Sequence, residues 1–316
     1  MSVVTEKERQ ATPQGPSASK TEVKTIAVIG GGAMGSGIAQ VASQSGYNVI
    51  LRDLNDSYLE TGWKNICGSL DRIVKKGTIT EKNKEEILSR IQRTTDLNKI
   101  KDADLIIEAV TEDLETKRAL FRELDKIAKS TAILATNTSS LSVTELAKET
   151  KRPHLVIGLH FFNPVPVMKL VEVVRTPYTT NEAFNTAWGV SVQLGKTPIA
   201  AKDTPGFIFN RLIIPYLNEA MWALYEGIGS VDDIDKAMKL GGNMPIGPLA
   251  LLDLVGIDVQ LHACETFFRE FGDPKFRPCP LNRSMVRAGF YGRKTQKGFY
   301  DYSVDPPRPL TCEELP

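Results

Sequence analysis

The stretch Gly30-Gly31-Gly32-Ala33-Met34-Gly35 follows the short apolar run Thr25–Ile29 and precedes a segment of helical periodicity. It matches the pattern G-x-G-x-x-G, which is common in isolation because glycine-rich turns serve many purposes. Between a strand and a helix, however, the pattern is typical of the first turn of a dinucleotide-binding βαβ unit. Asp53 ends the next apolar run, about 20 residues further along, where such units carry an acidic residue. A glycine turn used only for packing is the competing interpretation, and this context disfavours it.

Each position of the motif has a physical role in binding a dinucleotide. Gly30 permits a tight turn, Gly32 lets the backbone approach a pyrophosphate, and Gly35 allows the helix to pack closely. The backbone N–H groups at the helix start, which the motif places at Ala33 and Met34, face the phosphates. We therefore predict a dinucleotide-binding site at this turn.

Asp53 predicts which dinucleotide is bound. Its carboxylate would accept hydrogen bonds from the adenosine ribose hydroxyls and would repel a 2′-phosphate. NAD(H) is therefore the expected cofactor, although the adjacent Arg52 leaves NADP(H) open.

From Thr25 onward, short apolar runs alternate with longer helical patterns, which is typical of βαβ units. The sequence predicts an α/β fold with a Rossmann-type, doubly wound, mainly parallel sheet. The expected strands span Thr25–Ile29, Asn48–Asp53, Leu105–Val110, Ala132–Asn137, His154–His160, Met168–Val174 and Thr197–Ala201. Helices are expected at Tyr58–Lys76, Glu112–Lys129 and Asn181–Gln193, and Ser142 with Glu145 is expected to open a further helix.

The pattern changes at Lys202-Asp203-Thr204-Pro205-Gly206, beyond which only helical patterns are visible. An all-α C-terminal domain is therefore expected, with long helices at Phe207–Tyr225 and Leu249–Phe271 and a short helix capped by Ser230. The helix Phe207–Tyr225 is apolar on nearly every face, which indicates burial within the domain or between subunits. The expected domains are a disordered tail at 1–23, an NAD-binding domain at 24–203, a helical substrate and dimerisation domain at 204–303, and a C-terminal tail at 304–316.

The composition is that of a soluble globular protein, with 41% hydrophobic and 24% charged residues. The 39 basic and 38 acidic side chains give a formal net charge of +1, which provides no field to attract nucleic acid or anionic lipid. No segment approaches the length of a membrane span. The cysteines lack metal-ligand spacing, so no metal and a reducing compartment are expected: Cys67, Cys264, Cys279 and Cys312. We expect a cytoplasmic protein, with an organellar matrix left open because a removed targeting segment would leave no trace.

A histidine and a glutamate occupy neighbouring apolar runs in the later part of the expected sheet. His160 ends one run and precedes Phe161-Phe162-Asn163-Pro164, which places it at the carboxyl edge of the sheet, where α/β proteins bind ligands. Glu172 lies on the next run, and a carboxylate beside an imidazole orients the ring and favours its protonated form. Asn137-Thr138-Ser139-Ser140 follows another strand and brings hydroxyl groups to the same edge. These residues predict a dehydrogenase with a His–Glu pair.

Two of these segments, Gly158–Val165 (GLHFFNPV) and Asn137–Ser140 (NTSS), resemble signatures of the L-3-hydroxyacyl-CoA dehydrogenase family. The short-chain 3-hydroxybutyryl-CoA dehydrogenases are its most similar members. The resemblance implies an acyl-CoA substrate and a homodimer built on the helical domains, with a hexamer left open. It runs from about Lys24 to Tyr302 and includes Asp203–Phe207, Asn210-Arg211, Gly292–Thr295 and Gly298–Tyr300.

The resemblance implies a catalytic role for four residues. His160 would be the base that takes the proton of the 3-hydroxyl group while hydride leaves C3 for the nicotinamide. Glu172 would hold and polarise His160. Ser139 and Asn210 would hydrogen-bond the substrate oxygen and so stabilise the charge that develops there.

The resemblance also implies binding roles. Glu112, Lys117 and Asn163, together with Ser139, would lie at the ribose and nicotinamide end of the cofactor. Ser69 and Lys76 would bind coenzyme A, and their spacing independently puts them on one face of the expected helix. For Lys76 the competing interpretation is a solvated helix end, where cations are favoured in any case.

Two residues depart from the family pattern, because Gln296 replaces a frequent glycine and Ile246 a common methionine. Both lie in the expected helical domain. Two other functions stay open. The layout also resembles the wider 3-hydroxy acid dehydrogenase group, which uses a lysine base, for which Lys202 with Asn210 is the candidate. A related CoA-independent sugar-acid dehydrogenase belongs to the same alternative. A non-catalytic NAD-binding protein would also keep the fold.

Overall fold

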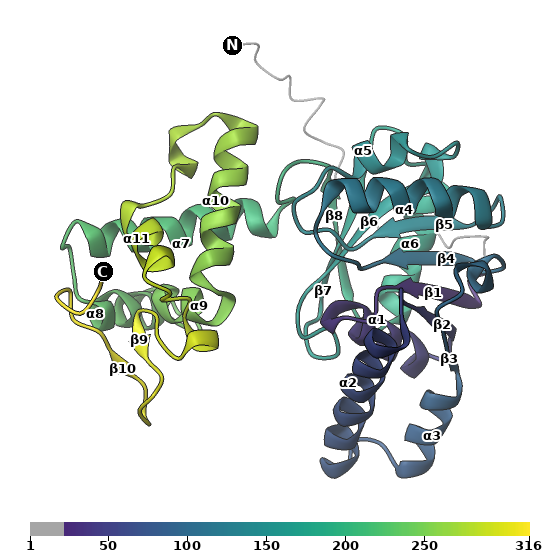
Figure 1. The fold of residues 1–316 in the computed structure, drawn as a ribbon, viewed down its shortest axis with the longest axis horizontal. Coiled ribbons are helices and arrows are strands. Elements are labelled where there is room, and N and C mark those ends of the chain that lie inside the picture. Colours follow the sequence, from purple (N-terminus) through teal and green to yellow (C-terminus); the bar gives the residue numbers. More distant parts are fainter. Residues whose placement is uncertain (1–21) are drawn as a thin grey trace. The chain divides into compact units, whose positions relative to one another are not determined.

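The computed structural model describes residues 22–316, so the tail expected at 1–23 lies outside the described residues apart from its last two positions. Contacts along the chain divide it between Thr204 and Pro205 into two compact units (Figure 1). This division lies inside the Lys202–Gly206 stretch, where the sequence pattern changes.

The first unit is built on an eight-stranded sheet with the order β3-β2-β1-β4-β5-β6-β7-β8. All neighbours are parallel except β6 and β7, which pair antiparallel. The strand order reverses between β1 and β4, the kind of switch point at which doubly wound sheets bind ligands. The predicted doubly wound, mainly parallel sheet is therefore confirmed. Its strands are β1 (Thr25–Ile29), β2 (Asn48–Arg52), β3 (Ile91–Thr94), β4 (Leu105–Glu108), β5 (Ile133–Thr136), β6 (Val156–Phe161), β7 (Leu170–Arg175) and β8 (Thr197–Lys202).

Helices cover both faces of this sheet. Figure 1 shows α4 and α5 in front of the strands and α6 behind them. Ile26 and Val28 of β1 belong to one core with Ile38 of α1 and Phe184 of α6. The helices of this unit are α1 (Ala33–Gln44), α2 (Asp56–Lys75), α3 (Glu81–Ser89), α4 (Leu114–Ile127), α5 (Val143–Lys148) and α6 (Asn181–Gln193), with 3-10 turns at Leu97–Ile100 and Pro153–Leu155.

The sequence pattern missed helix α3 and the edge strand β3. Ile87 is the buried residue of α3 and Ile91 that of β3, whose next two side chains are exposed. Neither element therefore has the apolar periodicity that marks the others.

Several predicted boundaries in this unit differ from the structure by one or two residues, and two of these differences have a clear local cause. The strand expected at His154–His160 begins at Val156, because Pro153 first opens a 3-10 turn. The helix expected at Glu112–Lys129 begins at Leu114, because Asp113 is its N-cap and accepts from the backbone N–H of Thr116. Glu112 therefore lies in the loop before α4 and not on the helix.

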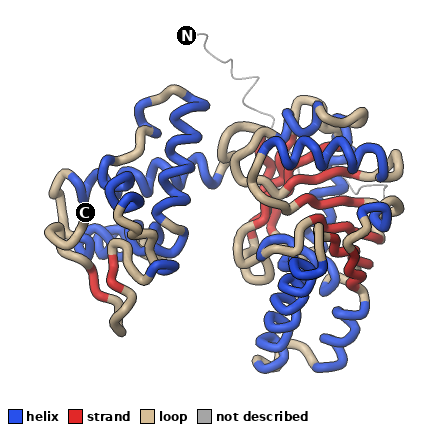
Figure 2. Tube along the Cα trace, viewed as in Figure 1, coloured by secondary structure: helices blue, strands red, loops and turns tan. Residues whose placement is uncertain are grey.

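The second unit is helical, as Figure 2 shows, so the predicted helical C-terminal domain is confirmed. Its chain end carries a two-stranded antiparallel ladder of β9 (Tyr300–Asp301) and β10 (Arg308–Pro309). The helices are α7 (Phe209–Tyr225), α8 (Val231–Lys236), α9 (Pro248–Val255), α10 (Ile257–Phe271) and α11 (Pro280–Arg287), with 3-10 turns at Pro274–Phe276 and Arg293–Thr295 and a π-helical turn at Ala237–Gly241. No helix within residues 22–316 combines the length and hydropathy needed to cross a bilayer.

The prediction of a single helix at Leu249–Phe271 is wrong, because the helix is interrupted at Gly256, between α9 and α10. This residue has a φ of +111°, a conformation that favours glycine. The C-terminal segment after Tyr302 also folds back onto the unit: Leu310 is buried, and its N–H donates to the carbonyl of Phe299 at 2.9 Å.

Two buried carboxylates hold the second unit together. Asp235 accepts from the backbone N–H groups of Leu249 and Ala250, at 2.8 and 3.0 Å, and so caps the start of α9. Asp253 accepts from the N–H groups of Phe299 and Tyr300, both at 2.9 Å. Burial raises the pKa of Asp253 to about 6, although these donors oppose the shift.

Candidate active site

The glycine turn is formed by contacts that exclude any side chain at two of its positions. Gly30 has a φ of +107°, and a Cβ atom there would lie 2.5 Å from the carbonyl oxygen of Ala109. A Cβ atom on Gly35 would lie 1.8 Å from the carbonyl oxygen of Gly30. A Cβ atom on Gly32 would meet nothing within 4 Å. The turn thus packs tightly against β4 and α1, and its Gly32 side is open.

A cavity of about 530 Å³ lies beside this turn. Its walls come from the glycine turn, the end of β2, the start of α2 and the segment from β4 into α4. Asp53 lines the cavity, and its carboxylate accepts from the backbone N–H groups of Gly31 at 2.5 Å and Leu54 at 2.6 Å. The predicted acidic residue is therefore held against the glycine turn.

His160 and Glu172 face each other across the antiparallel pair of β6 and β7. They are direct partners in the strand register, and the distance from His160 Nδ1 to Glu172 Oε2 is 2.8 Å. His160 is 6% exposed and Glu172 is fully buried. The carboxylate therefore orients the ring in a medium that screens charge weakly. The imidazole also lies near Phe162, with 4.5 Å between ring centroids.

A buried ion pair joins the end of β4 to α4, next to the loop that connects these two elements. The Lys117 side chain is 1% exposed, and its ammonium group lies 2.5 Å from Oε1 of the fully buried Glu108. Glu108 also accepts from the hydroxyl of Thr136 at 2.7 Å and the N–H of Val110 at 2.8 Å. The other carboxylate near this ammonium is Glu112, at 3.3 Å. Lys117 therefore forms ion pairs with both Glu108, which is buried in the sheet, and Glu112, which lies in the loop before α4.

Glu112 connects this ion pair to the serine loop after β5. It accepts from the Thr138 hydroxyl at 2.6 Å and from the backbone N–H of Ser139 at 2.8 Å. Burial opposes its charged form, but Lys117 and these donors together hold the pKa of Glu112 below its usual range. The predicted residues Glu112, Lys117 and Ser139 thus lie in one network.

The serine loop is tied to its neighbours on two further sides. The side chain of Asn137 accepts from the backbone N–H of Phe161, one residue after His160, at 2.9 Å. At the other end of the loop, Asp203 accepts from the N–H groups of Val143 and Thr144 at the start of α5, at 3.0 and 2.6 Å. Ser139 is therefore carried by a loop that is fixed at both ends.

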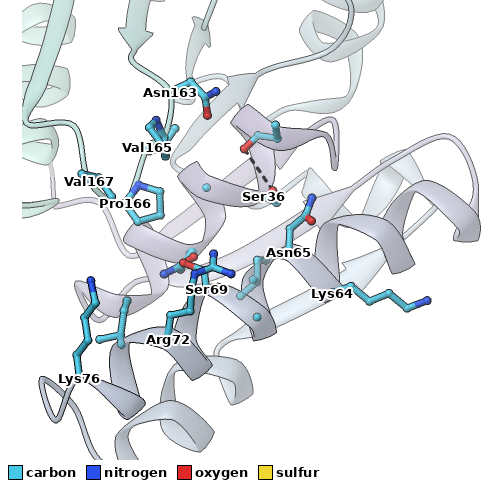
Figure 3. A pocket seen from close by; sticks show the side chains of 17 residues that line it. Ser36, Lys64, Asn65, Ser69, Arg72, Lys76, Asn163, Val165, Pro166 and Val167 are labelled. Atoms are coloured by element: carbon cyan, nitrogen blue, oxygen red, sulfur yellow. Dashed lines mark hydrogen bonds between the residues drawn. The ribbon is translucent and has the colours of Figure 1, made fainter. Parts of the chain in front are cut away.

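A second cavity, of about 580 Å³, lies between α1, α2 and the loop after β6. Ser69 of α2, Lys76 at the C-cap of α2 and Asn163 of the loop all line it, together with Arg72 of α2. Figure 3 shows Asn163, Val165, Pro166 and Val167 of the loop on one side, and Ser69 and Arg72 of α2 on the other. The structure therefore brings together three of the predicted residues at one cavity.

Other predicted residues lie elsewhere in the structure. Asn210 is the second residue of α7 in the second unit, whereas the other predicted site residues lie in the first. Gln296, which replaces a frequent glycine of the family, has a φ of +58°, so this side chain stands where glycine is favoured.

Sequence reasoning missed the roles of Glu108 and Asp203, and it placed the Thr138 hydroxyl at the sheet edge without naming Glu112 as its partner. A signal was present for Glu108, because an acid at the end of the apolar run Leu105–Ile107 needs a partner. No comparable signal marked Asp203, whose partners are two backbone N–H groups and the Ser142 hydroxyl, about 60 residues earlier in the chain.

The doubly wound sheet, its glycine turn and the acid that follows β2 define a dinucleotide-binding protein. Two family models match the chain: "3-hydroxyacyl-CoA dehydrogenase, NAD binding domain" at residues 25–204 and "3-hydroxyacyl-CoA dehydrogenase, C-terminal domain" at residues 206–302. The protein therefore belongs to the 3-hydroxyacyl-CoA dehydrogenase family. The family and the NAD(H) cofactor predicted from the sequence are both confirmed.

Individual relatives agree with the family match. The chain is 47% identical over 278 residues to 3-hydroxybutyryl-CoA dehydrogenase of Clostridioides difficile, covering 88% of this chain and 99% of that protein. It is 45% identical over 294 residues to human mitochondrial hydroxyacyl-coenzyme A dehydrogenase, covering 90% and 93%. Among solved structures, (S)-3-hydroxybutyryl-CoA dehydrogenase of Ralstonia eutropha is similar with a TM-score of 0.88 and 45% identity, covering 90% of this chain and all of that one.

Proposed function

We propose that this protein interconverts (S)-3-hydroxyacyl-CoA and 3-oxoacyl-CoA with NAD(H), and that 3-hydroxybutyryl-CoA and acetoacetyl-CoA are its main substrates. The observation that carries the proposal is the His160–Glu172 pair, with 2.8 Å between Nδ1 and Oε2, on the sheet that holds the glycine turn. The names of similar proteins support the choice of acyl group.

His160 is the proposed general base. Its Nδ1 is oriented by Glu172, so Nε2 is the ring nitrogen that exchanges a proton with the substrate. In the oxidative direction it takes the proton of the 3-hydroxyl group, while the hydrogen on C3 departs with its electron pair. NAD⁺, when bound, supplies the hydride acceptor. In the reductive direction protonated His160 returns the proton to the ketone oxygen.

Glu172 is the proposed electrostatic partner of this base. A fully buried carboxylate stabilises the imidazolium that forms as the proton is transferred. Ser139 and Asn210 are proposed to hydrogen-bond the substrate oxygen, so that the charge on it is balanced during the transfer.

The first cavity is the proposed adenosine site. Asp53 would accept from the ribose hydroxyls there, and the N–H groups of Ala33 and Met34 at the start of α1 would face the pyrophosphate, which fits the open side of Gly32. Glu112, held by Lys117, is proposed to receive the ribose at the nicotinamide end.

The nicotinamide end is proposed to lie between the serine loop and Asn163. Ser139 would contact both the cofactor and the substrate oxygen there. Its backbone N–H donates to Glu112, which fixes the position of the serine loop. The second cavity is the proposed coenzyme A groove, with Ser69 on its wall and Lys76 offering a cation to a phosphate group.

A homodimer through the helical unit is the proposed assembly. Several large apolar side chains of this unit are exposed to solvent in the single chain. Exposed apolar side chains of this kind are typical of a surface that another protein covers. They are Leu212, Ile228, Leu240, Leu254 and Val259. Sedimentation velocity of the full chain tests this, and a monomer at micromolar concentration would contradict it.

The function is tested by mixing acetoacetyl-CoA with NADH and following the loss of NADH absorbance. We expect rapid oxidation of NADH, and slower turnover with NADPH and with free acetoacetate. Turnover of free hydroxy acids without turnover of the thioester would favour the CoA-independent alternative. Binding of NADH without any turnover would favour the non-catalytic alternative.

A further inference from the structure

We propose that Lys196 is a positioning residue that fixes one wall of the coenzyme A groove. This inference rests on the proposed function, which assigns the second cavity to coenzyme A. Lys196 lies in the turn between α6 and β8 and is 8% exposed. Its ammonium group donates to the carbonyl oxygen of Val165 and, at 2.9 Å, to that of Met168.

The two carbonyl groups belong to residues 163–168, which we name the wall loop because most of them line the groove. The backbone N–H groups of Val167 and Met168 both donate to the carbonyl of Pro164, at 2.9 and 3.0 Å. The wall loop is therefore a tight turn, and a cation can bind carbonyl groups at the end of such a turn as it does at a helix C-terminus. Lys196 is not itself among the residues that line the groove, so it acts through the wall loop.

The wall loop is also seated against α1. Val165 is 1% exposed, and a Cβ atom on Gly37 would lie 2.8 Å from the Cβ atom of Val165, closer than side chains approach each other. The wall loop is thus held by Lys196 and by the surface of α1 at the same residue, Val165. These two contacts hold the wall loop on the side of the groove opposite Ser69 of α2 and Lys76 at its C-cap.

The charge on Lys196 distinguishes this contact from ordinary packing. Among the described residues no carboxylate forms an ion pair with it, whereas the buried Lys117 has Glu108. Burial, with a smaller effect of the nearby Lys169, lowers the pKa of Lys196 to about 8. A buried cation without an anion costs free energy that an apolar side chain would not. In spite of this cost in free energy, the Lys196 ammonium is kept in contact with the wall loop of a binding site.

The test compares Lys196→Met with the wild type on two substrates. One is acetoacetyl-CoA, and the other is acetoacetyl-N-acetylcysteamine, which has the same reacting carbons but lacks the nucleotide. We expect the KM for acetoacetyl-CoA to rise by at least about tenfold, because hydrogen bonds from a charged donor are strong. The kcat and the kcat/KM for the short thioester should stay near wild-type values, since the reacting groups are untouched. The KM for NADH should rise by a smaller factor than the KM for acetoacetyl-CoA, because only Asn163, at the start of the wall loop, is proposed to contact the cofactor.

Two further variants make the result decisive. Lys169→Met removes an exposed cation next to the wall loop and should change none of these constants. Lys196→Gln keeps an amide donor that reaches only one carbonyl, so its KM for acetoacetyl-CoA should lie between those of the wild type and Lys196→Met. Should Lys196→Met fail to fold, Lys196→Gln decides the matter alone.

Equal losses on both thioesters would overturn the proposal, because they would indicate general damage to the fold. An unchanged KM for acetoacetyl-CoA in both Lys196 variants would overturn it as well. A wild-type protein inactive on acetoacetyl-CoA would instead contradict the proposed function. Calorimetric titration with coenzyme A would then test the groove and Lys196 without reference to turnover.

Discussion

Glu172 in the first unit and Asp253 in the second are both buried acids, at 0% and 1% exposure, but their partners differ in kind. Glu172 lies 2.8 Å from the ring of His160, the group proposed to exchange a proton with the substrate. Asp253 accepts from two backbone N–H groups and from the hydroxyl of Tyr302 at 3.1 Å, and these donors have no part in the proposed proton transfer.

The difference shows that burial of a carboxylate does not by itself mark chemistry. The strong pKa shift belongs to Asp253, which connects α9 to the C-terminal ladder of its own unit and lines neither of the two cavities of the first unit. Glu172 is set apart by its partner and by its place on the ligand-binding sheet. We therefore expect changes at Glu172 and His160 to affect turnover and changes at Asp253 to affect stability.

The largest effect is expected for His160→Gln. It should lower kcat by about 10² to 10⁴-fold, because the proton acceptor is lost while the shape is nearly kept. NADH binding, measured by fluorescence titration, should stay near normal. If this variant kept its turnover while Lys202→Ala lost it, the lysine-base alternative would replace the one proposed here.

Glu172→Gln is expected to have the next largest effect, lowering kcat by about 10 to 100-fold because the charge that stabilises the imidazolium is removed. Oxidation requires neutral His160, and without the anion the neutral ring is favoured. The rise of the oxidation rate with pH should therefore move to lower pH, and the fall of the reduction rate should move likewise. A profile that stays in place would mean that Glu172 does not act on the ring charge.

Asp253→Asn should leave kcat unchanged and lower the free energy of unfolding by about 1 to 3 kcal/mol, because an amide nitrogen cannot accept from the donors around it. In the wild type the pKa of this group is about 6 when folded against 3.8 as its ordinary value, so the folded state binds more protons between these values. Stability therefore falls as pH rises through this window, and the variant should lack that slope. Urea unfolding between pH 4.5 and about 6.5 measures the difference.

Asp53→Ala tests an acid of a third kind, which lines a cavity and accepts from the glycine turn. We expect the KM for NADH to rise about tenfold through lost ribose hydrogen bonds, and the preference over NADPH to narrow or reverse. Both cofactors should be measured on both proteins. A wild type that already prefers NADPH would contradict this role and point to Arg52.

The smallest effect is expected for Lys76→Ala, which removes an exposed cation of the groove and no buried group. The KM for acetoacetyl-CoA should rise by about two- to fivefold with little change in kcat, because exposed ion pairs are weak. An unchanged KM in a correctly folded variant would place the nucleotide of coenzyme A elsewhere.

The parts of the site that could be predicted are those encoded by neighbouring residues. The glycine turn lies within six residues of sequence, and its steric reason holds in the structure: no Cβ fits at Gly30 or Gly35. His160 and Glu172 could be placed on neighbouring strands from their apolar runs. Their direct opposition required the strand register, which the antiparallel pairing of β6 and β7 supplies.

The parts that could not be predicted depend on backbone partners or on weak patterns. Lys196 binds two carbonyl groups, and carbonyl groups leave no trace in the side-chain sequence. Edge strand β3 has one buried residue and so lacks an apolar run. The break at Gly256 was hidden by apolar residues on both sides, which continued the helical pattern across it.

The central claim, that His160 and Glu172 act as one unit, is tested most directly by a double-mutant cycle on kcat for acetoacetyl-CoA reduction at saturating NADH. The four proteins are the wild type, His160→Gln, Glu172→Gln and the double variant. We predict that the double variant is no slower than His160→Gln alone, because Glu172 has no ring charge to stabilise once the imidazole is gone. If the two losses multiplied in the double variant, the residues would act independently, which would contradict the pairing proposed here.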